Sequence, residues 1–151
     1  MKQLTFVIAL LVISASAVAR IPAGTWVRQD VIPHVGTMIM LVEPAGSGIK
    51  LTYRIKGLDG TTSPMVMTIV SQLDGKEASV LVDGKPTGET MAITQVDANH
   101  TRTILKMDGK PFGTSVAELS KDGKVLKVEN EITFAAYNRQ VGKTTETWVK
   151  Q

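Results

Sequence analysis

The sequence predicts an all-β protein, an antiparallel up-and-down meander barrel of about eight to ten strands. Strand-like alternation recurs along the chain after Arg20, and helical periodicity is absent there. Residues 49–56 alternate between apolar and polar side chains without exception, as a half-buried antiparallel strand does. The segments with strand character are residues 24–29, 37–43, 49–56, 65–72, 77–82, 89–96, 101–107, 112–120, 125–134 and 144–150.

Turn signals separate these segments at short intervals. The tripeptide Asp-Gly-Lys occurs four times between strand-like runs, and Asp-Gly favours tight hairpins because both residues tolerate positive φ. Neighbouring strands are therefore expected to pair with one another. The predicted turns begin at Asp74, Asp83, Asp108 and Asp122, with two further turn clusters at residues 44–48 and 97–100.

Closure into a barrel is the expected solution for the two edge strands. About 130 residues follow the N-terminal segment, which is the size of one domain. A meander of that size removes its exposed edges most simply by pairing its first strand with its last. A β-sandwich also fits the strand count, but sandwiches of this length usually need longer Greek-key connections than these turns offer.

The N-terminal segment has the features of an export signal. Lys2 precedes an apolar stretch over residues 4–13, and Ala17-Val18-Ala19 forms a small-residue cleavage site. The apolar stretch is half the length of a membrane span, which needs about 20 residues. We therefore predict a signal peptide at residues 1–19 and a barrel domain at residues 20–151. The mature protein is expected to be secreted or periplasmic, without a stable membrane anchor.

Composition argues against most catalytic classes. The net charge is only +3, without a basic stripe interleaved with aromatic residues, so nucleic acid is not an expected partner. The chain has no cysteine, and its two histidines, His34 and His100, fall in predicted loops. Glu129 and Glu131 share one face of a strand, which we assign to solvent rather than to paired-carboxylate chemistry. With no phosphate-binding or dinucleotide motif present, we expect a protein that is not an enzyme and has no cofactor.

Several short motifs resemble a known family. Gly24-Thr25-Trp26 stands at the start of the first predicted strand, as Gly-x-Trp does in lipocalins and related calycin barrels. Residues 96–99, 106–110, 119–128 and 148–151 resemble a group of small exported bacterial lipocalin-like proteins. The chain departs from that group at Trp148, where a tyrosine is typical, and at residues 30–36, which lack a counterpart of the group's first loop.

The resemblance implies a way of closing the barrel. Trp26 is expected to plug one end, with a basic residue near the last strand, Lys150 or Arg139, lying beside it. An indole fills a tapering barrel end, and a long cationic stem packs across its face. Trp26 and Lys150 are therefore expected to be structural, and the resemblance implies no particular activity.

Methionine is the compositional oddity of the chain. Seven methionines stand against two tryptophans, two tyrosines and three phenylalanines. Three interpretations remain open: flexible core filling, a soft lining for a hydrophobic ligand, or a Cu(I) site of thioethers with His34 or His100. Six of the methionines lie in the predicted domain, namely Met38, Met40, Met65, Met67, Met91 and Met107.

The leading functional hypothesis is a non-enzymatic exported barrel that binds a small hydrophobic ligand in its interior. Arg54 or Arg102 is a candidate polar anchor for that ligand. The alternatives are an envelope-associated structural or interaction module with a packed interior and, ranked below it, a periplasmic Cu(I)-binding protein, although the sequence shows no dense metal-ligand cluster. The candidate lining residues are Met40, Tyr53, Met67, Met91, Ile93, Met107 and Phe134.

Overall fold

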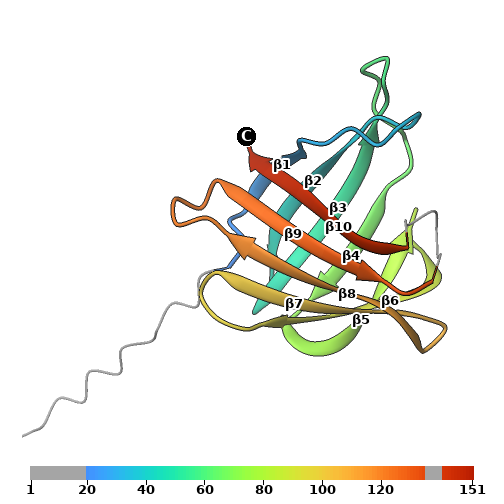
Figure 1. Cartoon of the computed structure of the whole chain (residues 1–151). Coiled ribbons are helices and arrows are strands. Elements are labelled where there is room, and N and C mark those ends of the chain that lie inside the picture. Colours follow the sequence, from blue (N-terminus) through green and yellow to red (C-terminus); the bar gives the residue numbers. More distant parts are fainter. Residues whose placement is uncertain (1–19, 135–140) are drawn as a thin grey trace, which may run out of the picture.

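A computed structural model describes residues 20–134 and 141–151 of the chain, and these residues form an all-β fold (Figure 1). The expected signal peptide at residues 1–19 and Arg139 lie outside the described residues. Among the residues described, no helix has the length and apolarity needed to cross a membrane. The ten strands are β1 (Gly24–Arg28), β2 (Thr37–Ala45), β3 (Gly48–Lys56), β4 (Met67–Ser71), β5 (Asp74–Val82), β6 (Lys85–Gln95), β7 (His100–Met107), β8 (Lys110–Leu119), β9 (Val125–Ile132) and β10 (Gly142–Lys150).

The strands form one closed antiparallel barrel with up-and-down order, which confirms the predicted fold class. Every strand pairs with its neighbours in sequence, and β1 pairs with β10 to close the ring. The register at this closure places Trp26 opposite Lys150 and Arg28 opposite Trp148. The sandwich alternative is wrong for this chain, because no connection crosses between layers within the described residues.

Two of the predicted Asp-Gly turns have the positive φ angles expected of this dipeptide. Asp83 and Asp108 both have φ of +48°, and the glycines that follow them both have φ of +78°. Positive φ at both central residues is the type I′ turn, whose twist matches that of the flanking strands. These turns join β5 to β6 and β7 to β8. The turn at Asp122 is longer, and the Ser120 hydroxyl accepts a hydrogen bond from the Val125 amide at 2.9 Å.

The fourth Asp-Gly pair is not a turn, which corrects the prediction. Asp74 begins β5 and pairs with Thr94 of β6, while the chain reverses just before it, where Leu73 has φ of +61°. The register between β5 and β6 shifts between Asp74 and Glu77. Gly75, with φ of +80°, therefore lies at a β-bulge or similar irregularity within β5, where glycine is common, and not in a hairpin turn.

The two ends of the barrel differ in their connections. At one end the strands are joined by residues 46–47, 72–73, 96–99 and 120–124. The opposite end carries the longer connections of residues 29–36 and 57–66, together with two type I′ turns. The main core cluster lies toward the first end, which we call the closed end. Its buried members are Trp26, Met40, Val42, Ile49, Leu51, Leu73, Ile93, Leu119, Leu126 and Trp148.

Candidate functional site

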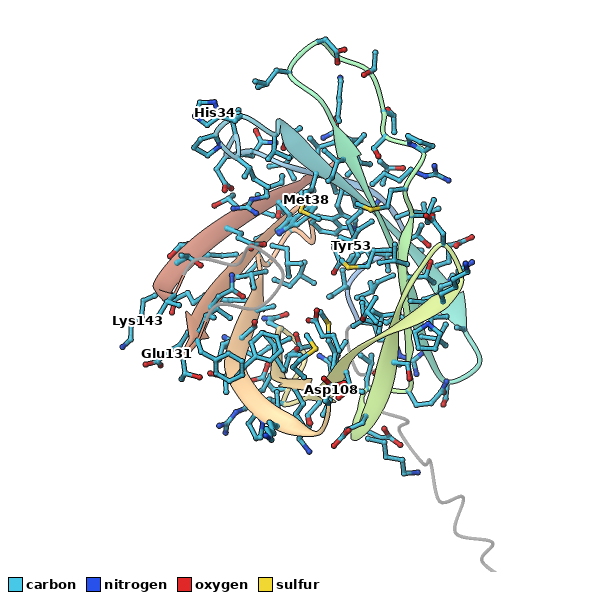
Figure 2. The ribbon with its side chains drawn as sticks, turned by 90° about the vertical axis from the view of Figure 1, so that its right-hand side faces the viewer. His34, Met38, Tyr53, Asp108, Glu131 and Lys143 are labelled. Atoms are coloured by element: carbon cyan, nitrogen blue, oxygen red, sulfur yellow. The ribbon has the colours of Figure 1, made fainter. Side chains whose placement is uncertain are left out.

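The ladder register shows which side chains face the interior of the barrel. Residues directly opposite one another in an antiparallel pair lie on the same face, and residues two apart on one strand share that face. Trp26 is fully buried, so its partners Met40 and Lys150 also face inward. In Figure 2, Met38 and Tyr53 lie on the inner side of the ring of strands, whereas Glu131 and Lys143 lie outside it.

Six of the seven predicted lining residues lie on the inner face. Met40, Tyr53 and Met67 are successive partners across β2, β3 and β4. Met91 and Ile93 of β6 pair with Leu105 and Thr103 of β7. Met107 lies two residues after Leu105 on β7, where its partner is Glu89, so it faces inward as well. Met40 and Ile93 are buried, whereas Tyr53, Met67, Met91 and Met107 are half-buried.

Phe134 does not line the interior wall and corrects that part of the prediction. It lies beyond the end of β9 with 44% of its surface exposed. Its ring instead covers Phe112, with the ring centroids 5.7 Å apart and the planes tilted by 51°. Phe112 is fully buried and forms a second apolar cluster with Leu105 and Ile132. Phe134 therefore extends this cluster at the end of the barrel with the longer connections.

Several inward side chains are accessible to water although the barrel is closed. Met38, Tyr53, Met67 and Met91 are only half-buried. Water reaches a side chain on the inner face of a closed ring of strands through space inside the ring or through one of its ends. We call the interior of this barrel the lumen, and these side chains are the part of its surface that water reaches. The same half-burial is found at inward polar residues on the opposite side, which are Ser115, Asn130, Thr144 and Glu146.

These polar residues form a connected row that the sequence analysis missed. The Ser115 hydroxyl donates to Asn130 Oδ1 at 2.6 Å, and Asn130 Nδ2 donates to Glu146 Oε1 at 3.1 Å. The Trp148 indole donates to Glu146 Oε2 at 3.1 Å. Arg28 Nη1 lies 3.4 Å from Glu146 Oε1. We call Ser115, Asn130, Glu146 and Arg28 the polar wall, which crosses four neighbouring strands, β8, β9, β10 and β1.

Asp30 completes the ion-pair arrangement beside the polar wall. Its Oδ2 accepts a hydrogen bond from Arg28 Nε at 2.6 Å and also pairs with Nη2 of the same guanidinium. Burial alone raises the pKa of Asp30, but the hydrogen bond and charge of Arg28 outweigh it, so the pKa lies below its usual 3.8. Arg28 is therefore held between two carboxylates, those of Asp30 and Glu146.

The predicted polar anchors Arg54 and Arg102 face solvent, which corrects that expectation. Tyr53 faces inward, so its neighbour Arg54 faces outward, and Arg102 alternates in the same way with the inward Thr103. The sequence did contain a signal for the inward arginine. Arg28 lies two residues after Trp26, so strand alternation places both on one face.

Trp26 and Lys150 are brought together as the resemblance implies. Trp26 is fully buried, and its indole donates to the Pro22 carbonyl at 3.0 Å. Lys150 is its partner across the β1–β10 ladder. A Cβ atom on Gly24 would lie only 3.2 Å from Lys150 Nζ, so the lysine side chain passes close over the glycine of the Gly-x-Trp motif. This arrangement lies at the closed end.

The remaining candidate residues lie outside the lumen. Glu129 and Glu131 are exposed, as expected for the solvent face of β9. His34 is exposed in the β1–β2 connection with φ of +62°, and His100 Nδ1 lies 2.8 Å from Asp97 Oδ1. Within residues 20–134 and 141–151, no group of three or more histidine, aspartate or glutamate side chains has a metal-binding arrangement.

Two cavities are lined by other parts of the barrel. One of about 190 Å³ lies at the closed end, between residues 20–23 and parts of β2 and β3 that include Val42 and Ile49 of the core. The other, of about 330 Å³, lies along β8, β9 and β10, and its lining includes Asn130 and Thr144 together with the outward-facing Glu131 and Lys143. Neither contains a residue of the predicted lining.

Comparison with known proteins adds no relative to this picture. No protein-family model, curated protein or solved structure matches the chain. The barrel and the side chains inside it are therefore the features from which a function has to be inferred.

Proposed function

We propose that this protein is an exported, non-enzymatic, lipocalin-like barrel that binds a small hydrophobic ligand in its lumen. The observation that best supports this proposal is that inward side chains of the closed barrel, such as Met38, Tyr53 and Met91, are only half-buried. A fully packed barrel buries the inward side chains at the middle of its strands, so half-burial there supports space for a ligand.

One side of the lumen has the character of a hydrophobic binding surface. Met38, Tyr53, Met67 and Met91 come from β2, β3, β4 and β6. Methionine side chains are unbranched and flexible, so they adapt to ligands of different shape. Covering such a surface with an apolar ligand contributes on the order of 25 cal/mol per Å² of apolar area removed from water.

The end opposite Trp26 supplies the expected route of entry. The longer connections at residues 29–36 and 57–66 lie there, whereas the other end is filled by the main core cluster. Loops at the mouth of a barrel are common places for ligand access. The cavity over β8 to β10 is not the proposed site for an apolar ligand, because three charged residues, Glu129, Glu131 and Lys143, line it.

A fluorescence titration with N-phenyl-1-naphthylamine, a neutral apolar probe, tests the proposal. Ala117 is a half-buried inward residue of β8, and its neighbour Val116 is 45% exposed on the outer face. Ala117→Phe narrows the lumen, so we expect probe affinity to fall at least tenfold. Val116→Phe adds the same ring outside the lumen and is expected to leave affinity within twofold of the unmodified protein.

Two outcomes would contradict ligand binding in the lumen. Absence of probe uptake by the folded protein would favour the alternative of a structural or interaction module with a packed interior. Equal loss of affinity in both variants would place the probe elsewhere. Native mass spectrometry of protein purified from its host adds a second measurement, in which a bound small molecule is expected.

Export has its own test. The N-terminal sequence of the exported protein is expected to begin near Arg20.

A further inference from the structure

We propose that the polar wall recognises the head group of the ligand and that this head group is a protonated amine. The inference rests on the proposed function and names the ligand class: an apolar molecule with one ammonium group. It follows from the oxygen lone pairs that Ser115 and Glu146 retain, from the combined charge of the polar wall and Asp30, and from the neighbouring aromatic and apolar side chains.

The side-chain donors of Ser115 and Asn130 in the polar wall, and that of the neighbouring Trp148, are used in internal contacts. The hydroxyl of Ser115 donates to Asn130, and the amide nitrogen of Asn130 lies within hydrogen-bond distance of both Glu146 and Thr144 Oγ1. The indole N–H of Trp148 is directed at Glu146. The capacity that remains on these groups consists of oxygen lone pairs, chiefly on Ser115 and Glu146. A ligand that donates hydrogen bonds matches this surface better than one that accepts them.

Charge points to the same ligand class. Arg28 is shared between the carboxylates of Asp30 and Glu146, so the three groups together carry one net negative charge at neutral pH. The exposed fraction of the Arg28 side chain is 16%, against 23% for Glu146 and 41% for Asp30. The two carboxylate side chains are thus more exposed than the guanidinium side chain between them. An anionic head group has to displace a carboxylate from Arg28, whereas an ammonium group offsets the excess charge.

An aromatic pair lies next to this charged surface. The rings of Tyr53 and Trp148 meet edge to face with centroids 5.9 Å apart and planes at 68°. Trp148 also holds Glu146 through its indole N–H, so the carboxylate and the aromatic pair are adjacent. Carboxylates and electron-rich ring faces together attract ammonium groups. From there the methionines of β2, β4 and β6 offer a surface for the apolar remainder of the ligand.

Competition among three probes of equal chain length tests the inference. Dodecylammonium, dodecanol and dodecanoate, each below its aggregation concentration at pH 7, are titrated against the protein loaded with N-phenyl-1-naphthylamine. We expect dodecylammonium to displace the probe at a concentration at least tenfold lower than dodecanoate and several-fold lower than dodecanol. Equal displacement by all three, a preference for dodecanoate, or no displacement by any of them would overturn the amine assignment.

Two variants show whether the polar wall causes the preference. Glu146→Gln removes the central carboxylate with little change in size, and we expect it to abolish the advantage of dodecylammonium over dodecanol. Glu131→Gln makes the same change on the outer face of β9 and is expected to keep the preference. Ser115→Ala, which keeps every charge, is expected to weaken dodecylammonium binding by a smaller factor.

The design separates the two proposals. Failure of N-phenyl-1-naphthylamine itself to bind contradicts the binding function. Normal binding of that probe without an ammonium preference contradicts only the inference about the head group. The comparison of the three alkyl probes uses the unmodified protein, so it stands even if Glu146→Gln fails to fold.

Discussion

The side chain of Lys150 lies over Gly24, with its Nζ only 3.2 Å from the position that a Cβ atom on Gly24 would occupy. Gly24 also has φ of +129°, a backbone conformation that side chains with a Cβ rarely adopt. Two physical factors therefore favour glycine at this position of the Gly-x-Trp motif: it leaves space for the Lys150 side chain, and it adopts a positive φ without strain. The position lies where the first and last strands pair to close the barrel.

Gly24→Ala is therefore expected to destabilise the barrel by about 2 kcal/mol through backbone strain and crowding of Lys150. Urea denaturation followed by tryptophan fluorescence measures the change. Gly60→Ala is the matched control, because Gly60 also has positive φ but no atom lies within 4 Å of an added Cβ. A loss at Gly24 no larger than the loss at Gly60 would show that contact with Lys150 is immaterial.

Removing the indole at the closed end is expected to have a larger effect. Trp26 is fully buried within the main core cluster, so Trp26→Ala leaves a large void and should cost about 4 kcal/mol. Trp26→Phe keeps a ring in place and should cost less than half as much. Urea midpoints of the two variants, followed by far-UV circular dichroism, provide the comparison. A loss below about 1 kcal/mol for Trp26→Ala would exclude the predicted plug.

Arg28 and Glu146 of the polar wall are expected to make coupled contributions to the free energy of unfolding. Arg28→Met leaves two carboxylates facing one another without their shared cation, at a cost of about 2 kcal/mol. Combining it with Glu146→Gln removes part of that repulsion, so the double variant should lose less than the sum of the single variants. A double-mutant cycle in urea measures the difference. Simple additivity would mean that Arg28 and Glu146 do not interact in solution.

The Asp30 carboxylate gives stability a defined pH dependence. Its pKa in the folded protein lies below 3.8, so its ionised form stabilises the fold above that pH, and the contribution is lost as pH falls through the folded value. Asp30→Asn should therefore cost up to about 1 kcal/mol at pH 7, discounted for solvent exposure, and almost nothing near pH 2. Stability curves at both values check this. An equal deficit at pH 7 and pH 2 would contradict the assignment.

The strand pattern was predictable because each strand shows its two faces in its own sequence. Residues 49–56 alternate perfectly, and the structure extends this strand by one residue. Asp83 and Asp108 were also predictable, since a two-residue turn depends only on its own φ angles. Asp74 was misjudged because Asp-Gly tolerates a strand irregularity as readily as a turn, and only pairing with Thr94 decides between them.

The sequence predicted only the apolar half of the proposed binding surface. Met40, Tyr53 and Met67 were found because apolar side chains on an alternating strand are expected inside. Arg28 and Glu146 follow the same alternation from Trp26 and Trp148, yet polarity alone assigns them to solvent. Alternation gives their inward direction, but the groups that balance their charges come from other segments of the chain, and no local pattern in the sequence reveals those partners.

The ring of strands is unevenly joined. The ladder between β4 and β5 has two residue pairs, Met67↔Val82 and Thr68↔Leu81, and the ladder between β1 and β10 has three. These are the two shortest ladders of the closed ring, so fewer paired residues oppose local opening there than elsewhere in the wall. Amide hydrogens at these two junctions should therefore be the first in the strands to exchange with deuterium.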